Sequence, residues 1–517
     1  MNEIAMPADF FVPIQGGQLG LLLPYLIIAG GGLLVMLVDS FVRTLKKDHL
    51  SYLTLCVLIS AVVVQIVGAG TGGRFTGTEM PLLGGMLIVS EFSRFFNFLF
   101  VVIGIVTTIF ATGLYDREGR YRPEFYPLLL FSILGMMVLA AAGDLLTVFL
   151  GLETMSLATY ILVGGVRGNV RSSEAGFKYL ILGGFSSAFL LMGMGLLYGF
   201  AGGTGFADLS RAMGQQDPDG LLVALGSALM LVGFGFKVAM VPFHMWTPDV
   251  YEGAPSYITG FMATAVKAAG FAILTRFVIL MQPQLSFIWY PVLTVLAVLT
   301  MTAGNLIALV QNNIKRLLAW SSVAHAGYLL LGVLTLMSPA VGGSGMMMRT
   351  REIGEAAGAS ILFYLIGYSL MNLAAFGIVN VLGRKAGEDA DDINRYAGLS
   401  RRNPLAAATL AIALLSLAGI PPFVGFMAKF YLFAAVVRAG LVPLAIIGVI
   451  NSLLSVYYYL RVVVVMYMKE PEEDSYDGVE WVSIVASSVL ALLVIYLGIQ
   501  PAAFHRAAEI VFSNVSF

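Results

Sequence analysis

Five ionisable residues stand inside or at the edge of otherwise apolar stretches. They are Glu153, in LLTVFLGLETMSLATYIL, and the four lysines Lys178, Lys237, Lys267 and Lys429. An ionised group at the centre of a membrane helix costs about 2.5–3.5 kcal/mol on insertion scales, so such groups persist only where they face a bundle interior, water or one another. One glutamate cannot neutralise four lysines, so we expect some of the amines to be neutral or to share protons.

Buried amines beside a carboxylate are suited to proton transfer. Burial disfavours the charged form of an amine, whereas a nearby carboxylate favours it. An amine under both influences can gain or lose a proton near neutral pH, so moving Glu153 closer to Lys237 or farther from it would load or unload a proton. The pattern predicts a proton relay that needs no cofactor.

Prolines accompany two of the lysines. Lys237 is followed by three prolines in GFKVAMVPFHMWTPDVYEGAP, and Lys429 follows two adjacent prolines in GIPPFVGFMAKF. Proline lacks an N–H group and clashes with the carbonyl four residues earlier, and backbone groups freed at membrane depth must be satisfied by protein or water. We therefore expect two broken helices where water can reach the amine. A packing kink would explain the prolines of one stretch, but not a lysine at both.

Several of these residues also have a structural explanation. Lys178, near the start of its apolar stretch, could extend its amine to the membrane surface. His325, in WSSVAHAGYLLLG, could donate to a core carbonyl as readily as it could carry a proton. His244, beside the first break, is more typical of a cap on the broken helix end than of a titrating group.

The elements that must position these side chains are membrane helices. Of 517 residues, 59% are hydrophobic and 11% are charged, against about 25% charged in soluble domains, so we predict an all-α polytopic membrane protein. A span needs about 20 apolar residues, and the twelfth predicted span is too long for one straight helix. Fourteen candidate spans follow one another at 18–38, 50–70, 92–114, 125–142, 145–166, 176–201, 221–245, 257–281, 287–309, 317–337, 356–381, 404–438, 441–468 and 479–501.

Charge and composition exclude several classes of function. The formal net charge is −1, which gives no indication of nucleic-acid binding. The single cysteine excludes disulfides within the chain, iron–sulfur clusters and cysteine-based metal sites. The four histidines lack ligand spacing, so we expect no metal site. The N-terminus has no basic segment before the first apolar stretch, so we expect that stretch to be a retained span.

Lys and Arg are more frequent in the loops after odd-numbered spans than in those after even-numbered spans and in the tails. The positive-inside rule places the first set of loops in the cytoplasm, so both termini should lie on the non-cytoplasmic side. A miscounted span would scramble this asymmetry, which therefore also supports the number fourteen.

A faint internal repeat divides the chain. Tyr-Leu-Ile recurs at 179–181 and 364–366, and the proline breaks of spans seven and twelve each lie beside a lysine. Spans four to eight would repeat as spans nine to thirteen, and five spans per unit require opposite orientations, as in transporters built from inverted repeats. Chance similarity among apolar strings is the alternative. The predicted boundaries are 1–124 for three N-terminal helices, 125–281 and 282–468 for the two five-helix repeats, and 469–517 for a C-terminal helix.

These motifs resemble a known family. FKVAMVPFHMWTPDVYEGAP, followed by ATAVKAAGF, resembles the antiporter-like subunits of respiratory complex I, the proton-pumping NADH:quinone oxidoreductase, and the related Mrp-type sodium/proton antiporters. WTPDVYEGAP, GIPPFVGFMAKFYLF and NNIKRLLAWSSVAHAGY are similar in particular to the subunit N branch of that family. The resemblance runs from about span four to span thirteen.

The resemblance implies roles for individual residues. Glu153 and Lys237 match the pair thought to gate proton uptake, Lys267 the central lysine, and Lys429 the lysine that faces the exit side. Lys178 matches an extra lysine of span six. His325, likewise, falls at the family's histidine of span ten.

The resemblance also implies a function: proton translocation in the membrane arm of an oxidoreductase whose donor is NADH or a related compound. Flavin, iron–sulfur clusters and quinone would lie on partner subunits, with no cofactor in this chain. The other membrane-arm subunits of the same complex are the expected protein partners. The bacterial inner membrane is the expected location, and protons and lipid are the expected small partners. The alternative is a stand-alone or hydrogenase-linked cation/proton antiporter subunit.

Overall fold

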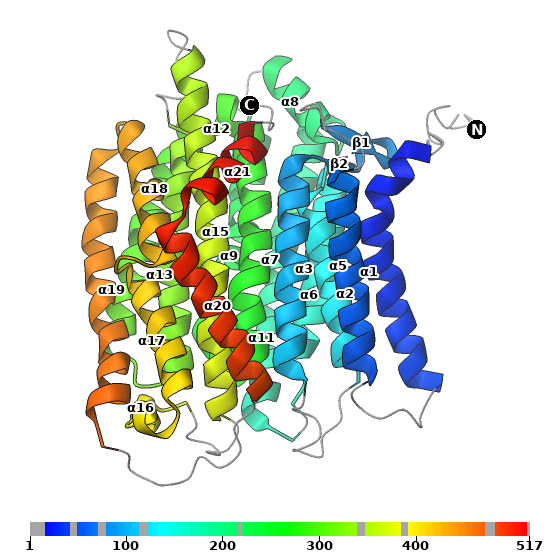
Figure 1. Ribbon diagram of the computed structural model, residues 1–517. Helices are drawn as coiled ribbons and strands as arrows, with labels where there is room; N and C mark the ends of the chain where they lie inside the picture. Colours follow the sequence, from blue (N-terminus) through cyan, green and yellow to red (C-terminus); the bar gives the residue numbers. More distant parts are fainter. Residues whose placement is uncertain are drawn as a thin grey trace.

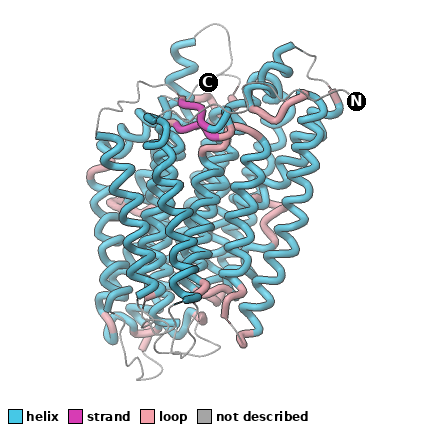
Figure 2. The backbone as a smooth tube through the Cα atoms, turned by 90° about the vertical axis from the view of Figure 1, so that its right-hand side faces the viewer, coloured by secondary structure: helices cyan, strands magenta, loops and turns pink. Residues whose placement is uncertain are grey.

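The chain folds into a bundle of long helices that stand side by side, as the two perpendicular views show (Figures 1 and 2). The computed structural model describes residues 16–41, 49–70, 79–112, 123–166, 168–215, 220–338, 347–383, 391–470 and 481–513. The first fifteen residues, and the predicted basic loops at 42–48 and 113–122, lie outside the described residues.

The membrane-length and other apolar helices account for nearly all of the bundle. They are α1 (Gly16–Phe41), α2 (His49–Gly70), α3 (Glu91–Ala111), α5 (Phe125–Ala140), α6 (Leu145–Val163), α7 (Val170–Ala201), α9 (Leu221–Val238), α11 (Ser256–Phe261), a π-helical turn (Met262–Val266), α12 (Lys267–Leu309), α13 (Ile314–Leu336), α15 (Met347–Gly383), α17 (Pro404–Ala418), α18 (Val424–Arg438), α19 (Val442–Met468) and α20 (Trp481–Ile499).

Short elements close the two ends of the bundle. They are the antiparallel hairpin β1 (Met80–Leu82) and β2 (Leu87–Val89), the helices α8 (Phe206–Gln215), α10 (Trp246–Gly253), α16 (Leu399–Arg402) and α21 (Ala502–Ser513), and two 3-10 turns at Leu83–Gly85 and Ile393–Tyr396. The start of α1 and the end of α21 lie at the same end of the bundle as the hairpin, and α16 lies at the opposite end (Figure 1).

The expectation of an all-α polytopic membrane protein is confirmed. Within the described residues, twelve helical segments are long and apolar enough to cross a membrane. Two further predicted spans correspond to the shorter apolar helices α5 and α17. The eighth and ninth predicted spans correspond to Ser256–Leu280 and Trp289–Leu309, and the backbone between them stays helical. The number fourteen and the inverted repeat remain predictions.

Polar residues fix where several helices begin. The first turn of a helix leaves backbone N–H groups without a partner, and a preceding Ser, Asp or Asn side chain can accept from them. Helices that begin in this way within the described residues are α3 at Ser90, α6 at Asp144, α7 at Asn169, α13 at Asn313 and α17 at Asn403.

Both predicted helix breaks are present. After α9, Ala239 adopts a left-handed conformation with φ of 60°, and regular helix resumes only at α10. After α17, Gly419 is left-handed with φ of 88°, and α18 begins at Val424. Lys237 lies two residues before Ala239, and Lys429 lies ten residues after Gly419, so each break has a lysine near it, as the proline pattern predicted.

Helices α5 and α6 approach so closely that their backbones touch at two glycines. A Cβ atom added to Gly151 would lie 2.7 Å from the backbone nitrogen of Leu139, and one added to Gly135 would lie 2.4 Å from that of Met155. These contacts involve backbone, which cannot rotate away, so the pair of glycines sets the position of α6 and of the residues that it carries.

We predict that Gly151→Ala lowers the free energy of unfolding by about 1–3 kcal/mol, because the added methyl overpacks the contact between α5 and α6. Gly195→Ala is the matched control, since a Cβ there meets nothing within 4 Å. Unfolding of the detergent-solubilised protein, followed by circular dichroism, measures both. Equal stability of the two variants would contradict the close backbone contact.

Candidate functional site

Glu153 and Lys237 are neighbours that are each bonded to a hydroxyl group. The half-buried carboxylate of Glu153, on α6, accepts a short hydrogen bond from Ser187 Oγ of α7. Lys237, in the last turn of α9 and 2% exposed, donates from Nζ to Ser156 Oγ at 2.7 Å and to Tyr160 Oη at 3.3 Å. Ser156 lies on α6 one turn after Glu153, so the carboxylate and the partner of the amine share one face of α6.

Aromatic rings enclose the Lys237 amine. Nζ lies 5.3 Å from the ring centroid of Tyr160, 5.7 Å from that of Tyr179 and 5.4 Å from that of Phe236. The faces of aromatic rings attract cations, and more strongly where water is excluded. The amine is thus held by two hydroxyls and three rings, with no carboxylate bonded to it.

The indole of Trp246 completes the break after α9. Its Nε1 donates to the carbonyl of Phe236 at 2.9 Å, which satisfies one of the carbonyls that the end of a helix leaves free. His244, expected as a cap at this break, bonds to the backbone of Pro242, and its ring packs against Trp320 with 5.1 Å between centroids. His244 and Trp246 thus both bond to backbone at the first break.

Lys267 lies at the start of α12, directly after the π-helical turn. Its amine, 2% exposed, donates to the carbonyl oxygen of Ser322 at 2.5 Å and makes a short hydrogen bond to Ser322 Oγ. Both acceptors belong to α13, so this amine bridges two neighbouring helices.

His325 is buried one turn along α13 from Ser322. Nδ1 lies 2.7 Å from the hydroxyl of Tyr364, and Nε2 lies 3.3 Å from that of Tyr459. Each ring nitrogen therefore meets a hydroxyl and neither meets a backbone carbonyl, which was the structural explanation considered for this residue. A neutral imidazole with a hydroxyl on each side can accept a proton at one nitrogen and release one from the other.

Tyrosine rings place His325 between two lysines. The ring of Tyr368 lies 5.1 Å from the His325 ring and 5.6 Å from Lys267 Nζ. The ring of Tyr328 lies 5.6 Å from the His325 ring and 5.3 Å from Lys429 Nζ. The structure thus brings Lys267, His325 and Lys429 into one continuous cluster.

Lys429 caps the second break. Its amine, 5% exposed, donates to the carbonyls of Leu417 and Ala418, both at 3.0 Å, and to Ser452 Oγ at 2.9 Å. These carbonyls belong to the last turn of α17, where the helix dipole is negative, so a positive amine is stabilised there.

The hydroxyl side chains that bond to the buried amines were not predicted from the sequence. Serines and tyrosines supply most of the bonds, and isolated hydroxyl residues in apolar helices are too common to single out. One signal was available: Glu153, Ser156 and Tyr160 are spaced three and four residues apart, which places them on one face of a helix.

Lys178 lies apart from the other lysines. Its side chain is 41% exposed, and its amine pairs with Glu174 at 2.7 Å and with Asp249 at 2.9 Å. Arg316 joins the cluster through Asp249 at 3.0 Å and Glu252 at 2.6 Å. The cluster ties α7, α10 and α13 together at one end of the bundle, so the structure does not bring Lys178 into the buried row.

Asp249 is the centre of this cluster and lies on α10, outside the helices of membrane length. Partial burial raises the pKa of its carboxyl, but the hydrogen bonds and charges of Lys178 and Arg316 together outweigh that effect, so the pKa lies below its ordinary value of 3.8. A lowered pKa contributes stability above the ordinary value, and the contribution disappears as the pH falls through the folded-state pKa.

We predict that Asp249→Asn lowers the free energy of unfolding by about 1 kcal/mol or less at neutral pH, because solvent screens this exposed cluster. The difference from the natural protein should shrink as the pH falls below the ordinary aspartate pKa, and vanish once the pH is below the lowered folded-state pKa of Asp249. Asp208→Asn is a suitable control, since Asp208 is equally exposed, at 40%, but pairs with one exposed arginine. Thermal unfolding across a pH series measures both, and a difference that persists in acid would contradict the assignment.

The part of the chain that the structure describes contains no group of side chains that could bind a metal ion. There, no group of three or more His, Cys, Asp or Glu side chains lies close enough to hold an ion. The chemistry available to the buried row is proton binding and release by amines, one imidazole, one carboxylate and the hydroxyls between them.

Comparison with known proteins shows the broad class of membrane protein to which the chain belongs. The family model described as NADH:quinone oxidoreductase/Mrp antiporter, TM, matches residues 142–455, which include every residue of the buried row. A chain of the Mrp complex from a Dietzia species has the same fold, with a TM-score of 0.78 at 20% identity, covering 95% of this chain and 97% of that one.

Closer relatives narrow the assignment. NADH-quinone oxidoreductase subunit N of Trichlorobacter lovleyi is 42% identical over 479 residues, 92% of each chain. A chain of respiratory complex I from Thermus thermophilus superposes with a TM-score of 0.75 at 32% identity, covering 93% of this chain and 98% of that one. The chain belongs to the subunit N family of NADH-quinone oxidoreductase, which confirms the resemblance found in its motifs.

Proposed function

We propose that this chain is a proton-translocating subunit in the membrane arm of an oxidoreductase that passes electrons from NADH, or a related donor, to quinone. The observation that carries the proposal is the buried row of Glu153, Lys237, Lys267, His325 and Lys429, in a chain of the subunit N family. Redox chemistry takes place in other subunits, and this chain moves protons.

Proton uptake centres on Glu153 and Lys237. In the state described, Glu153 is bonded to Ser187 and Lys237 to Ser156 and Tyr160. If the carboxylate leaves Ser187 and approaches the amine, its charge favours the protonated amine. When it withdraws again, the buried amine favours its neutral form and passes the proton on.

Transfer then continues through the second half of the row. The proton reaches Lys267 and His325, whose two nitrogens face different tyrosine hydroxyls, and leaves by Lys429 beside the second break. Proline-broken helices expose backbone carbonyls that can hold water at membrane depth, which supplies the remaining links. Lys178 has a peripheral role, since it lies in the exposed ion cluster.

The energy scale fits this mechanism. Moving one charge across 100 mV requires about 2.3 kcal/mol. A change of one unit in a pKa supplies about 1.4 kcal/mol. Modest shifts in the proton affinity of two buried groups are therefore sufficient to drive a proton against a membrane potential.

The assembly completes the proposal. Flavin, iron–sulfur clusters and quinone lie on partner subunits, and the chain lies in a bacterial inner membrane with both termini on the non-cytoplasmic side. Residues 125–281 and 282–468 form two inverted five-helix units, preceded by the helices of 1–124 and followed by those of 469–517. The two helix breaks, one near Lys237 and one near Lys429, support this division.

The alternative is a stand-alone or hydrogenase-linked cation/proton antiporter subunit, which the fold shared with the Mrp complex favours. Native mass spectrometry of the detergent-extracted particle separates the two. Further subunits of an NADH-quinone oxidoreductase in the particle support the main proposal, and a particle of antiporter or hydrogenase subunits supports the alternative.

We predict that Lys237→Ala and Glu153→Ala each abolish or greatly reduce proton pumping, because each removes one member of the group that takes up the proton. Pumping is measured in vesicles that contain the assembled complex, with NADH as donor and a pH-sensitive dye as reporter. Undiminished pumping at normal assembly would refute the mechanism.

A purely structural role predicts a different outcome. A buried amine that serves only packing can be replaced by an apolar side chain of similar volume without loss, and often with a gain in stability. A structural role thus predicts that Lys237→Met assembles and pumps normally. Under the proposed mechanism we expect Lys237→Met to assemble at least as well as the natural chain but to fail in pumping. Normal pumping by this variant would establish the chain as a scaffold.

A further inference from the structure

A groove of about 840 Å³, which we call the α18–α19 groove, opens between these two helices on the outside of the bundle. Its walls are mostly apolar, and Phe430, Ile446 and Leu453 among them are each more than half exposed. Exposed apolar surface of this extent marks a place where a membrane lipid or another protein binds. The charges and the length of the groove decide between the two.

Two cationic side chains line the α18–α19 groove at different depths. Lys429 lies beside the second helix break, and its amine is already bonded to two carbonyls and to Ser452 Oγ. Arg438 is the last residue of α18, nine residues farther along the helix, which is a rise of about 14 Å. The chain turns back into α19 at Val442, so Arg438 lies at the end of the bundle and Lys429 lies deep in the apolar layer.

Arg438 has no polar partner among the residues that the structure describes. Its side chain is exposed, and no hydrogen bond or ion pair there involves its guanidinium. Its charge acts on His505 of α21, but the carboxylate of Glu509 bonds to His505 Nδ1, at 3.2 Å, and not to Arg438. An arginine offers a planar fork of N–H donors that matches the oxygens of a phosphate. The mouth of an apolar groove thus carries an unused phosphate-binding group.

The length of the α18–α19 groove fits a lipid better than a helix of a partner subunit. Its lining residues on α19 run from Val442 to Val456, a rise of about 21 Å. The hydrocarbon core of a bilayer is about 30 Å thick, so the groove starts at one surface and ends before the other. A lipid is anchored at one surface, whereas a helix that crosses the membrane needs a groove along its whole length.

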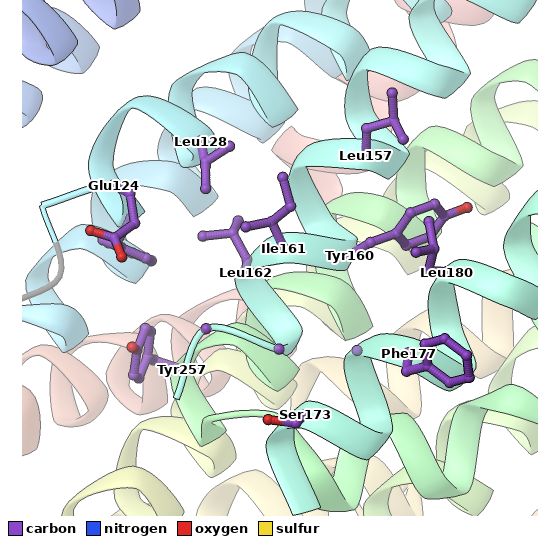
Figure 3. Close-up of a pocket in the computed structure, with 14 residues that line it drawn as sticks. Glu124, Leu128, Leu157, Tyr160, Ile161, Leu162, Ser173, Phe177, Leu180 and Tyr257 are labelled. Carbon is purple, nitrogen blue, oxygen red and sulfur yellow. The ribbon is translucent and has the colours of Figure 1, made fainter. Parts of the chain in front are cut away.

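A second opening, between α5, α6 and α7, has the same apolar character but a different charge (Figure 3). Its volume is about 640 Å³, and Leu128 and Ile161 belong to its walls. Glu124 lies at its border, and no lysine or arginine lines it within the described part of the chain. A carboxylate repels a phosphate, so this opening serves as an internal comparison for the effect of charge.

We infer that the α18–α19 groove binds an anionic phospholipid, which goes beyond the proposed function. The Arg438 guanidinium donates to the phosphate of the headgroup, and an acyl chain lies along the apolar walls as far as Lys429. A lipid of net negative charge is favoured, because the cation of a zwitterionic headgroup lies next to the phosphate and opposes the arginine. The bound chain closes the opening beside Lys429 with hydrocarbon, so water does not reach the amine from that side.

The first experiment compares two lipids on the natural protein. The assembled, detergent-extracted complex receives phosphatidylglycerol, which is anionic, or phosphatidylcholine, which is zwitterionic, each with a photoactivatable group in one acyl chain. After illumination, peptide mass spectrometry measures the label on α18 and α19 and, for comparison, on the walls of the opening between α5, α6 and α7.

We expect phosphatidylglycerol to label α18 and α19 about fivefold more than phosphatidylcholine does, because one basic residue near a lipid surface favours an anionic headgroup by a factor of that order. At the opening beside Glu124 we expect no such preference. Equal labelling of α18 and α19 by the two lipids would mean ordinary contact with the bilayer, and it would overturn the site.

The second experiment removes the charge. We expect Arg438→Gln to lower the phosphatidylglycerol label on α18 and α19 about fivefold. Arg438→Lys should keep most of the label, because lysine also binds phosphate, as a point charge. Arg211→Gln is the control, since Arg211 of α8 is 65% exposed, lies at the same end of the bundle (Figure 1) and does not line the groove. Unchanged labelling in Arg438→Gln, or an equal loss in Arg211→Gln, contradicts the assignment of Arg438.

The third experiment asks whether a protein fills the groove instead. Leu453, which is 72% exposed and lines the groove, is replaced by the photoreactive residue p-benzoylphenylalanine in the assembled complex. A cross-link to a phospholipid supports the site, whereas a cross-link to another subunit shows that a partner helix occupies the groove and rejects the site. None of these measurements depends on proton pumping, so the lipid site and the proposed function are tested separately.

Discussion

The architecture depends on one constraint, which is that a positive amine in hydrocarbon must be given partners by the protein. Three lysines are each at most 5% exposed within a bundle whose helices are otherwise apolar. Their partners come from different helices: Lys237 of α9 is bonded to α6, Lys267 of α12 to α13, and Lys429 of α18 to α17 and α19. The amines thus tie together the helices that surround them, and each helix break or π-helical turn lies where one of these bonds must be made.

The parts of this arrangement that follow from local chemistry could be predicted from the sequence. The length of the apolar stretches predicted the helices, and prolines near a lysine predicted both helix breaks. Both signals can be read in the sequence because a missing N–H and a buried charge are properties of single residues. The close contact of α5 and α6 could not be predicted, since Gly135 and Gly151 are two of 58 glycines and nothing in the chain marks them as partners.

The location of Lys178 also depends on contacts between residues that are far apart in the sequence. Its position near the start of an apolar stretch left a surface location open, and the fold places it beside Asp249 and Arg316, which are far away in sequence. What distinguishes Lys178 from Lys237 is the return of the chain through α10 after the first break, and that return depends on tertiary contacts such as the bond from Trp246 to Phe236.

The carbonyls that hold Lys429 have a further consequence. The carboxylate of Glu153 lies near Lys237, and a carboxylate can itself take up a proton and lose its charge. The end of α17 presents a partial negative charge that arises from aligned peptide dipoles and cannot be neutralised by any proton. The negative charge near Lys237 can therefore be removed by a proton, whereas the partial negative charge that holds Lys429 cannot. The two ends of the row thus differ in how they can stabilise a protonated amine.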